Sequence, residues 1–347
     1  MSLYLKYRPR TFKNIVWQYF IKETLLKAIS KDKLVWSYLF SWPKWTWKTS
    51  VARILAQWVN CQNYINDLCL KCNTCKETLN WQNADIIEID AASNSSVENI
   101  KQTIIKWSQY WPNSNHKYKV YIIDEVHMLS KSAFNALLKI MEEPPKYIIF
   151  ILATTEIEKI PDTIISRCQV YNFKTINKDD IIWRLEYICK EENIRFDEKW
   201  LNYIYNISEW SMRNAIKYLE QYSVEWNIYW EVLENKLGLV WEESIKLLLK
   251  HLYLAKKEDY KKVISIYDEI INSGKDIKLF LRNTCFYLRD KIIDEYKKDT
   301  PNSEFIKIYS YMMWEFENCI KQLHWAIDWN VTLLVTLSKI ISRNIKN

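Results

Sequence analysis

The sequence predicts an α/β domain built on a parallel sheet with helices on both faces, followed by an all-helical remainder. Residues 1–178 alternate short apolar runs with helix-length segments, an order typical of parallel sheets that are buried on both faces. After Lys174 the strand pattern stops and apolar residues recur at helical spacing. A chain of 347 residues suits two or three domains. We expect helical domains at 179–240 and 241–347.

Five segments have the length and composition of buried strands, and helix-length segments lie between them. Parallel sheets bind ligands beyond the carboxyl ends of their strands, so the chemistry is expected in the residues that follow them. The expected strands are residues 37–40, 86–90, 120–123, 148–153 and 169–173. The expected helices between them are residues 50–59, 97–106 and 132–142.

The stretch after the first strand has the frame of a phosphate-binding loop, but tryptophan stands at its glycine positions. Residues 41–50 read S-W-P-K-W-T-W-K-T-S, which matches G-x-x-x-x-G-K-[ST] in spacing and in its last two residues. Such a loop turns backbone N–H groups toward the anion, which requires positive φ and no side chain in the way. Three indoles would fill this cradle. The nucleotide-binding residues expected here are Trp42, Pro43, Lys44, Trp45, Thr46, Trp47, Lys48, Thr49 and Ser50.

The composition offers an explanation for this conflict. The chain holds 2 Gly and 18 Trp, whereas average usage would give roughly 24 Gly. We hypothesise that most of these tryptophans stand where the organism inserts glycine, because UGA is read as Gly in some genomes and as Trp in others. We call this the decoding hypothesis. UGG codons at positions 42, 45 and 47 would refute the hypothesis. The alternative is a Trp-rich protein whose loop no longer binds nucleotide.

The charge distribution favours a polyanionic partner. The formal net charge is +7, and residues 1–60 hold eleven Lys/Arg and two Asp/Glu. A basic N-terminal part suits nucleotide phosphates or a nucleic-acid backbone, although a solvated basic face gives the same pattern. Residues 1–10 contain no apolar signal-peptide core, and no apolar run approaches the roughly 20 residues that span a bilayer. We therefore expect a soluble, cytoplasmic protein with no membrane association.

Four of the eight cysteines are spaced as metal ligands. Cys61, Cys69, Cys72 and Cys75 can close a tetrahedral zinc shell, and a cytosolic cluster of this kind favours a metal over disulfides. Their polar neighbours argue against the alternative, reduced cysteines in a core. The sequence therefore predicts a closed structural zinc site. The remaining cysteines are expected to be small buried hydrophobes, and they are Cys168, Cys189, Cys285 and Cys319.

Two acids follow the third predicted strand. Asp124 and Glu125 occupy the place where phosphate-loop ATPases hold Mg²⁺ and polarise the attacking water. We assign Asp124 and Thr49 to Mg²⁺, Glu125 to the water, and Lys48 to the β- and γ-phosphates. For the Asp-Glu pair alone, a cap at the end of a strand is the alternative.

Three further polar residues are candidates by position. Thr155 follows the fourth strand, where it can reach a γ-phosphate or the water. Arg167 precedes the last strand and is too far along the chain to serve its own site simply, but it can stabilise charge in a neighbouring subunit. Arg213 begins a helix of the second domain and can fold down over the nucleotide. For either arginine, a surface ion pair is the alternative.

Taken together, these motifs resemble the gamma/tau family of clamp-loader ATPase subunits of bacterial DNA polymerase III. The match runs from residue 4 to about residue 240. Its other motifs are Tyr7-Arg8-Pro9, Val16-Trp17-Gln18, E-I-D-A-A-S at 88–93, D-E-V-H-M-L at 124–129, F-N-A-L-L-K at 134–139, E-E-P-P at 142–145, L-A-T-T at 152–155 and S-R-C at 166–168. The family usually carries glycine at six positions, which supports the decoding hypothesis: Trp17, Trp42, Trp45, Trp47, Trp81 and Trp210.

The resemblance implies roles for particular residues. It makes Thr155 a first sensor, Arg167 a trans-acting finger and Arg213 a second sensor. It implies an AAA+ module in residues 1–178, with the zinc-binding insertion at 61–75, then a helical lid and an oligomerising helical collar. It also adds to the nucleotide site the residues Tyr7, Arg8, Pro9 and Val16.

The resemblance further implies a function. The loader is a pentameric ring that uses ATP, with Mg²⁺, to open the sliding clamp and place it on primer–template DNA. Because the chain stops after the collar, it looks like the short, gamma-like form. One alternative is a non-hydrolysing structural subunit with a blocked loop, against which the retained Lys48, Thr49, Asp124 and Glu125 argue. Another is a helicase-like motor on branched DNA, which fits neither the cysteine cluster nor the helical C-terminus.

Overall fold

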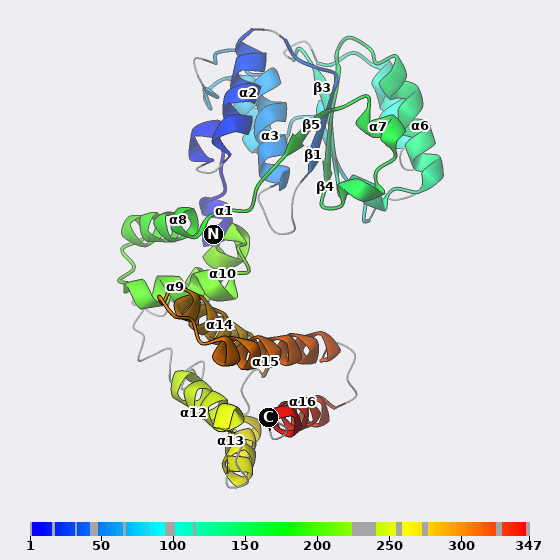
Figure 1. Ribbon diagram of the computed structural model, residues 1–347. Coiled ribbons are helices and arrows are strands. Elements are labelled where there is room, and N and C mark those ends of the chain that lie inside the picture. The colour runs from blue at the N-terminus through cyan, green and yellow to red at the C-terminus, as the bar shows by residue number, and fades with distance from the viewer. Residues whose placement is uncertain are drawn as a thin grey trace. The chain divides into compact units, whose positions relative to one another are not determined.

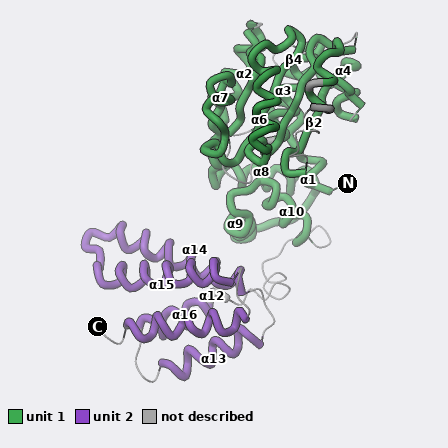
Figure 2. The backbone as a smooth tube through the Cα atoms, turned by 90° about the vertical axis from the view of Figure 1, so that its right-hand side faces the viewer, with its two compact units in different colours: residues 1–227 green, residues 228–347 purple. Residues whose placement is uncertain are grey.

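The computed structural model divides into two compact units, residues 1–227 and residues 228–347 (Figure 2). The predicted boundary at residue 240 lies outside the described residues. The structure describes residues 2–15, 18–31, 33–41, 48–64, 67–80, 82–93, 101–113, 116–223, 241–254, 259–272, 277–323 and 328–344.

The first unit is built on a five-stranded parallel sheet of order β2-β3-β4-β1-β5. The predicted parallel sheet is therefore confirmed, and each strand lies within one residue of its expected bounds. All four side chains from Ser37 to Phe40 are buried, and so are all seven residues of β4, because helices cover both faces of the sheet. The strands are β1 (Ser37–Ser41), β2 (Ile86–Asp90), β3 (Lys119–Asp124), β4 (Ile148–Thr154) and β5 (Gln169–Asn172).

Helices α2 (Tyr19–Ser30) and α3 (Lys48–Val59) cover one face of the sheet, and α6 (Lys131–Glu142) and α7 (Asp162–Ile165) cover the other (Figure 1). Side chains of a strand point alternately to the two faces. Tyr38 and Phe40 accordingly belong to the α2–α3 core, whereas Leu39 belongs to the α6–α7 core.

Local signals begin and end these elements. Ser130 caps α6, because its hydroxyl accepts the backbone N–H of Ala133 at 3.2 Å, and Pro144 follows the end of the same helix. The expected helix at 97–106 differs: residues 94–100 are not described, and η2 (Lys101–Lys106) is a π-helical turn. The described residues of this part also form the short helices α1 (Leu3–Lys6) and α4 (Asn73–Leu79) and the 3₁₀ turns η1 (Phe12–Asn14), η3 (Trp107–Gln109), η4 (Val126–Met128) and η5 (Ile157–Lys159).

A bundle of three helices follows the sheet: α8 (Lys178–Glu191), α9 (Glu198–Ile207) and α10 (Met212–Tyr222). The side chains of Asp197 and Ser211 cap α9 and α10, because each accepts the backbone N–H of the third residue of its helix, Trp200 and Asn214. Helix α1 packs against α10, so the N-terminal segment reaches the three-helix bundle (Figure 1).

In the second unit the described residues form helices α12 (Trp241–Leu254), α13 (Asp259–Asn272), α14 (Ile277–Tyr296), α15 (Ser303–Gln322) and α16 (Trp329–Asn344). Their shared core includes the fully buried Phe280 and Phe316, which confirms the expected helical character. Among the described residues, the structure contains no helix with the length and apolar character needed to cross a bilayer.

Candidate functional site

A cluster of oxygen-bearing side chains lies at the carboxyl ends of β3 and β4. Asp124 is the last residue of β3, and Thr49 is in the first turn of α3. The hydroxyl of Thr49 donates to Asp124 Oδ2 at 2.7 Å. The two side chains predicted to hold Mg²⁺ therefore meet, although they are 75 residues apart in the sequence. Hydroxyl and carboxylate oxygens are hard ligands of the kind that Mg²⁺ prefers, so the donor set fits the metal.

Glu125 is held beside this pair by an unusual backbone. Its φ is 48°, in the left-handed region, and its N–H donates to Asp124 Oδ1 at 2.9 Å. The hydroxyl of Thr155 donates to Glu125 Oε2 at 3.1 Å. Left-handed backbone at a non-glycine residue is uncommon and is found at functional sites. The structure thus brings together four of the predicted residues, Thr49, Asp124, Glu125 and Thr155.

His127 also belongs to the cluster, although the sequence pattern predicts no role for it. Its Nδ1 lies 3.0 Å from Thr154 Oγ1 and 3.5 Å from Glu125 Oε2. Its Nε2 lies 3.3 Å from Glu156 Oε1. The imidazole ring of His127 therefore links the residues that follow β3 to the end of β4, and it limits the positions that the Glu125 carboxylate can take. The only available signal was a histidine two residues after the acid pair.

Part of the predicted nucleotide site lies outside the described residues. This applies to Val16 and to Trp42, Pro43, Lys44, Trp45, Thr46 and Trp47. Lys48 begins α3, but its side chain is not described. The start of α3 still lies at the carboxyl end of β1, where a helix N-terminus presents unpaired N–H groups to an anion.

Trp210 bears on the identity of the tryptophans. Its φ is 60°, and that of the preceding Glu209 is 54°. A left-handed conformation costs an L-residue about 1–2 kcal/mol, a penalty that glycine does not carry. The backbone at position 210 is therefore the kind that selects glycine, in agreement with the decoding hypothesis.

Residues 2–15, which we call the N-terminal arm, reach the first turn of α3. Arg8 Nε donates to Ser50 Oγ at 2.7 Å. Burial lowers the pKa of the Arg8 guanidinium, and the positive charges of Arg53 and Arg213 act in the same direction. Pro9 and Arg8 line a cavity of about 490 Å³. Glu88 lines the same cavity, pairs with Arg53 at 2.6 Å and acts on the Arg8 pKa in the opposite direction.

Tyr7 and Arg213 contact protein groups away from the acid cluster. The Tyr7 hydroxyl donates to Glu192, and its ring lies edge-on to Tyr187 of α8 at 6.3 Å. The Arg213 guanidinium lies over the ring of Tyr4 at 4.7 Å. Both contacts join the N-terminal arm to the three-helix bundle.

Arg167 lies at the opposite end of the sheet from the acids. It precedes β5, so it stands at the amino ends of the parallel strands, whereas Asp124 ends β3. Arg167 Nη2 pairs with Glu142 Oε1 at 2.8 Å, and Nη1 donates to the Thr163 carbonyl at 2.8 Å. A strand of four residues spans about 13 Å, so Arg167 does not reach the acid cluster of its own chain.

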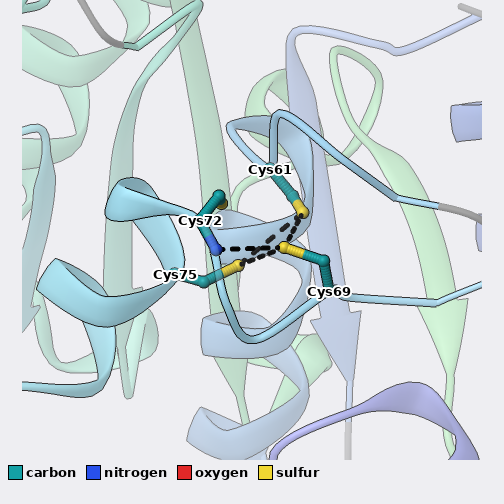
Figure 3. A group of neighbouring side chains, drawn as sticks. All are labelled: Cys61, Cys69, Cys72 and Cys75. Carbon is teal, nitrogen blue, oxygen red and sulfur yellow. Dashed lines mark hydrogen bonds between the residues drawn. The ribbon is translucent and has the colours of Figure 1, made fainter.

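The four predicted zinc ligands converge on one point (Figure 3). Their sulfur atoms all lie within 4.8 Å of one another, and three of the separations are 3.5, 3.6 and 3.8 Å. A tetrahedral site with Zn–S bonds of about 2.3 Å places sulfur atoms about 3.8 Å apart. The cluster therefore fits a zinc ion, and every cysteine in the described residues is free of disulfides.

Local hydrogen bonds prepare one of these thiols for a metal. Burial acts to raise the pKa of Cys69, but the N–H groups of Lys71 and Cys72, at 3.5 and 3.3 Å from its sulfur, outweigh burial and lower the pKa to about 6. Burial raises the pKa of Cys61 and that of Cys75. A cation at the centre would supply the charge that stabilises these buried thiolates.

Sequence relatives identify the group of proteins to which the chain is similar. A family model described as DNA polymerase III, delta subunit, matches residues 17–177. The tau subunit of DNA polymerase III from Bacillus subtilis is 40% identical over 296 residues, which cover 84% of this chain and 52% of that protein. The gamma subunit from Buchnera aphidicola subsp. Baizongia pistaciae is 34% identical over 362 residues, 98% of this chain and 96% of that protein. The chain thus spans about half of the tau subunit and nearly all of the gamma subunit.

Solved structures show the same fold. The RuvB Holliday junction branch migration motor of Thermotoga maritima matches with a TM-score of 0.51 and 15% identity, over 72% of this chain and 80% of that one. At this identity the likeness concerns the fold alone. The full-length match to a gamma subunit, together with the tau match, is decisive for the family: the chain belongs to the gamma/tau subunits of DNA polymerase III.

Proposed function

We propose that this chain is a clamp-loader subunit that binds and hydrolyses ATP. The single observation that carries the proposal is the contact between Thr49 and Asp124, with Glu125 and Thr155 beside it, at the carboxyl end of the sheet where α3 begins. A site with no nucleotide chemistry has no physical need for this arrangement. The same contacts disfavour the non-hydrolysing alternative.

Each residue of the cluster has a defined task in this proposal. When bound, Mg²⁺-ATP supplies the phosphoanhydride bond and neutralises the charge that develops on the phosphates. Thr49 and Asp124 hold the metal, and the Glu125 carboxylate accepts a proton from the attacking water. Thr155 and His127 hold Glu125 in place, because the Thr155 hydroxyl donates to its Oε2 atom at 3.1 Å and His127 Nδ1 lies 3.5 Å from the same atom. Lys48 and Ser50 complete the phosphate end of the site.

The domains follow from the same proposal. Residues 1–178 form the AAA+ module, with a zinc-binding insertion at 61–75, and residues 179–240 form its lid. Residues 241–347 form a collar that joins subunits into a pentameric ring. Arg8 and Pro9 line the nucleotide site from the N-terminal arm, and Arg213 acts as a sensor from the lid. The partners are the other subunits, the sliding clamp and primer–template DNA.

The proposal is tested by nucleotide binding and turnover of a chain with Trp42→Gly, Trp45→Gly and Trp47→Gly. This chain should bind ATP, and the addition of Lys48→Ala should abolish the binding. Glu125→Gln should preserve binding and lower kcat by a factor of about 10² or more, because a positioned base is removed. Glu143→Gln, an exposed acid-to-amide change after α6, is the matched control and should leave both quantities unaltered.

The outcomes separate the alternatives. If the glycine-substituted chain fails to bind ATP, the structural-subunit reading replaces the proposal. If the glycine-substituted chain binds ATP, but its Glu125→Gln variant hydrolyses ATP as fast as the glycine-substituted chain that retains Glu125, the assignment of Glu125 is wrong. The nucleotide site itself would still stand.

A further inference from the structure

Asp67 lies inside the cysteine cluster but directs its carboxylate at a distant segment. It is largely buried and lies between the ligands Cys61 and Cys69. Its Oδ2 accepts the backbone N–H of Lys13 at 2.9 Å, and its Oδ1 accepts that of Phe12 at 3.2 Å. Oδ1 also accepts the N–H of Leu68 at 2.8 Å. One carboxylate thus satisfies backbone donors on two segments that are more than fifty residues apart.

The donors at residues 12 and 13 form the turn η1, the far end of the N-terminal arm. Nearer its start, the arm contacts α3, because Arg8 donates to Ser50 one residue after the predicted metal ligand Thr49. At its beginning the arm contacts the three-helix bundle, where Arg184 Nη2 donates to the Tyr7 carbonyl at 3.0 Å and Lys6 pairs with Glu192 at 2.6 Å. The arm is therefore fixed at three places.

A bound metal would restrain the Asp67 end of the arm through the cysteine cluster. Cys61, Cys72 and Cys75 already pack in the core beside α3, and a zinc ion would add cross-links between the segments that carry the four cysteines. Cys61 lies two residues after the end of α3, and the Gln57 amide of that helix donates to the Cys75 carbonyl at 3.4 Å. When the four sulfur atoms are held together, the segment that carries Asp67 is held with them.

We propose that Asp67 couples the zinc site to the nucleotide site, by fixing the N-terminal arm so that Arg8 stays against the first turn of α3. Asp67 is a positioning residue in this inference, and it touches neither the zinc nor the nucleotide. The inference rests on the proposed function, because it requires that the chain bind ATP at α3.

Coupling between two binding sites is reciprocal, and this gives the inference its sharpest consequence. If zinc raises the affinity for ATP, ATP must raise the affinity for zinc by the same factor. We expect a factor of about ten, within the usual range for coupled sites. A residue that only stabilises the fold would weaken both sites without linking them.

The experiment uses the full chain with glycine at positions 42, 45 and 47, and compares it with a second chain that also carries Asp67→Asn. The asparagine keeps the shape but turns one acceptor into a donor opposite the Lys13 N–H. Co²⁺ replaces zinc, because its absorption reports an intact four-thiolate site. Glu77→Gln is the matched control, since Glu77 lies in α4, two residues after the insertion, and faces His116 at 3.2 Å.

The chain with glycine at positions 42, 45 and 47 and with Asp67 retained is called the parent chain. In it, saturating ATP should tighten Co²⁺ binding about tenfold, and Co²⁺ should tighten ATP binding equally. Asp67→Asn should keep the Co²⁺ spectrum, abolish the mutual effect and speed hydrogen exchange at the Phe12 and Lys13 amides. Glu77→Gln should keep the mutual effect. Equal coupling in the parent and the Asp67→Asn chain would overturn the inference.

The remaining outcomes are also decisive. A parent chain that binds both ligands independently overturns the inference but leaves the proposed function intact. A parent chain that binds no ATP overturns the proposed function and the inference with it. If Asp67→Asn loses the Co²⁺ spectrum, the residue is required for the metal site itself, and the proposed role as a link is wrong.

Discussion

At the scale of single residues, backbone conformation separates two adjacent acids. Asp124 ends β3 in extended conformation and meets Thr49, whereas Glu125 adopts a left-handed conformation and meets Thr155. The change of direction between them lets neighbouring carboxylates face different partners. A metal ligand and a base can therefore be adjacent in the sequence without sharing one location.

His127 is expected to act on turnover through Glu125 and Thr154. Its removal frees the Glu125 carboxylate to adopt other positions, and losses of such supporting contacts typically cost about 10- to 100-fold in activity. We predict that His127→Ala lowers kcat by about tenfold and leaves the Kd for ATP unchanged. Steady-state hydrolysis and equilibrium binding on the glycine-substituted chain measure the two quantities. Met128→Ala, an exposed neighbour, serves as control, and an equal loss there would contradict the assignment.

Position 210 gives a test of the decoding hypothesis in stability terms. Trp210→Gly removes the steric cost of a left-handed side chain and should raise the free energy of unfolding by about 1 kcal/mol. Urea denaturation measures the change. Trp183→Gly, at an exposed position inside α8, is the matched control and should lower stability by about 1 kcal/mol. A loss of stability at both positions would show that the indole at 210 is well accommodated.

At the scale of elements, the strands could be predicted and the contacts between distant segments could not. The run from Ile148 to Ala153 is continuously apolar and has polar or turn-forming neighbours, so its length and burial follow from composition. Asp67 carries no comparable signal, because its partners are backbone N–H groups, which every residue has. The short helix α4 was missed for a related reason, since seven residues are too few to show a helical period.

The candidate site likewise contains residues that could be predicted from the sequence and residues that could not. The Lys-Thr and Asp-Glu pairs were recognisable because their positions after strands are fixed by the topology of parallel sheets. Arg167 could be placed away from its own site from chain order alone, and β5 explains why. His127 and its contact with Thr154 depend on side-chain orientation, which no spacing rule supplies.

The contact of the N-terminal arm with α8 predicts a dependence of stability on pH. Hydrogen bonds from Lys6 and Tyr7 lower the pKa of the Glu192 carboxyl. A lowered pKa in the folded chain contributes stability above the unfolded value of about 4.3, and the contribution is lost as pH falls through the folded value. We predict that Glu192→Gln costs about 0.5 kcal/mol near neutral pH and nothing in acid. Urea denaturation at several pH values measures this, with the exposed Glu191→Gln as control.

At the scale of the whole molecule, the position of Arg167 separates two kinds of activity. The guanidinium stands at the amino ends of the strands, beside a cavity of about 860 Å³ that Lys31, Lys33 and Glu142 also line. If Arg167 is the trans-acting finger of the proposed ring, Arg167→Ala should leave ATP binding to the isolated chain unchanged but lower hydrolysis by the assembled subunits about 10³-fold. Binding to single chains and turnover by the reconstituted assembly distinguish these effects. Equal losses in both would place Arg167 in its own site.

Glu142→Ala provides the comparison for that experiment. This change removes the partner of Arg167 but keeps the guanidinium. If the ion pair aligns Arg167, turnover of the ring should fall by less than in Arg167→Ala, and Glu142→Ala should not alter binding to single chains. Loss of binding in single Glu142→Ala chains would indicate a folding defect.

The order of the strands also has a consequence for synthesis on the ribosome. The second-to-last strand in space, β1, is the first to be made, and it pairs with β4 and β5, so that Ser37 meets Phe150 and Tyr38 meets Gln169. Until those later segments emerge from the ribosome, β1 is an apolar strand whose two edges are unpaired and open to other nascent chains. A chain released early, for instance at a codon that the host treats as a terminator, would therefore be prone to aggregation. For the same reason, we expect protection by chaperones to matter most before residue 172, the end of β5, has left the exit tunnel.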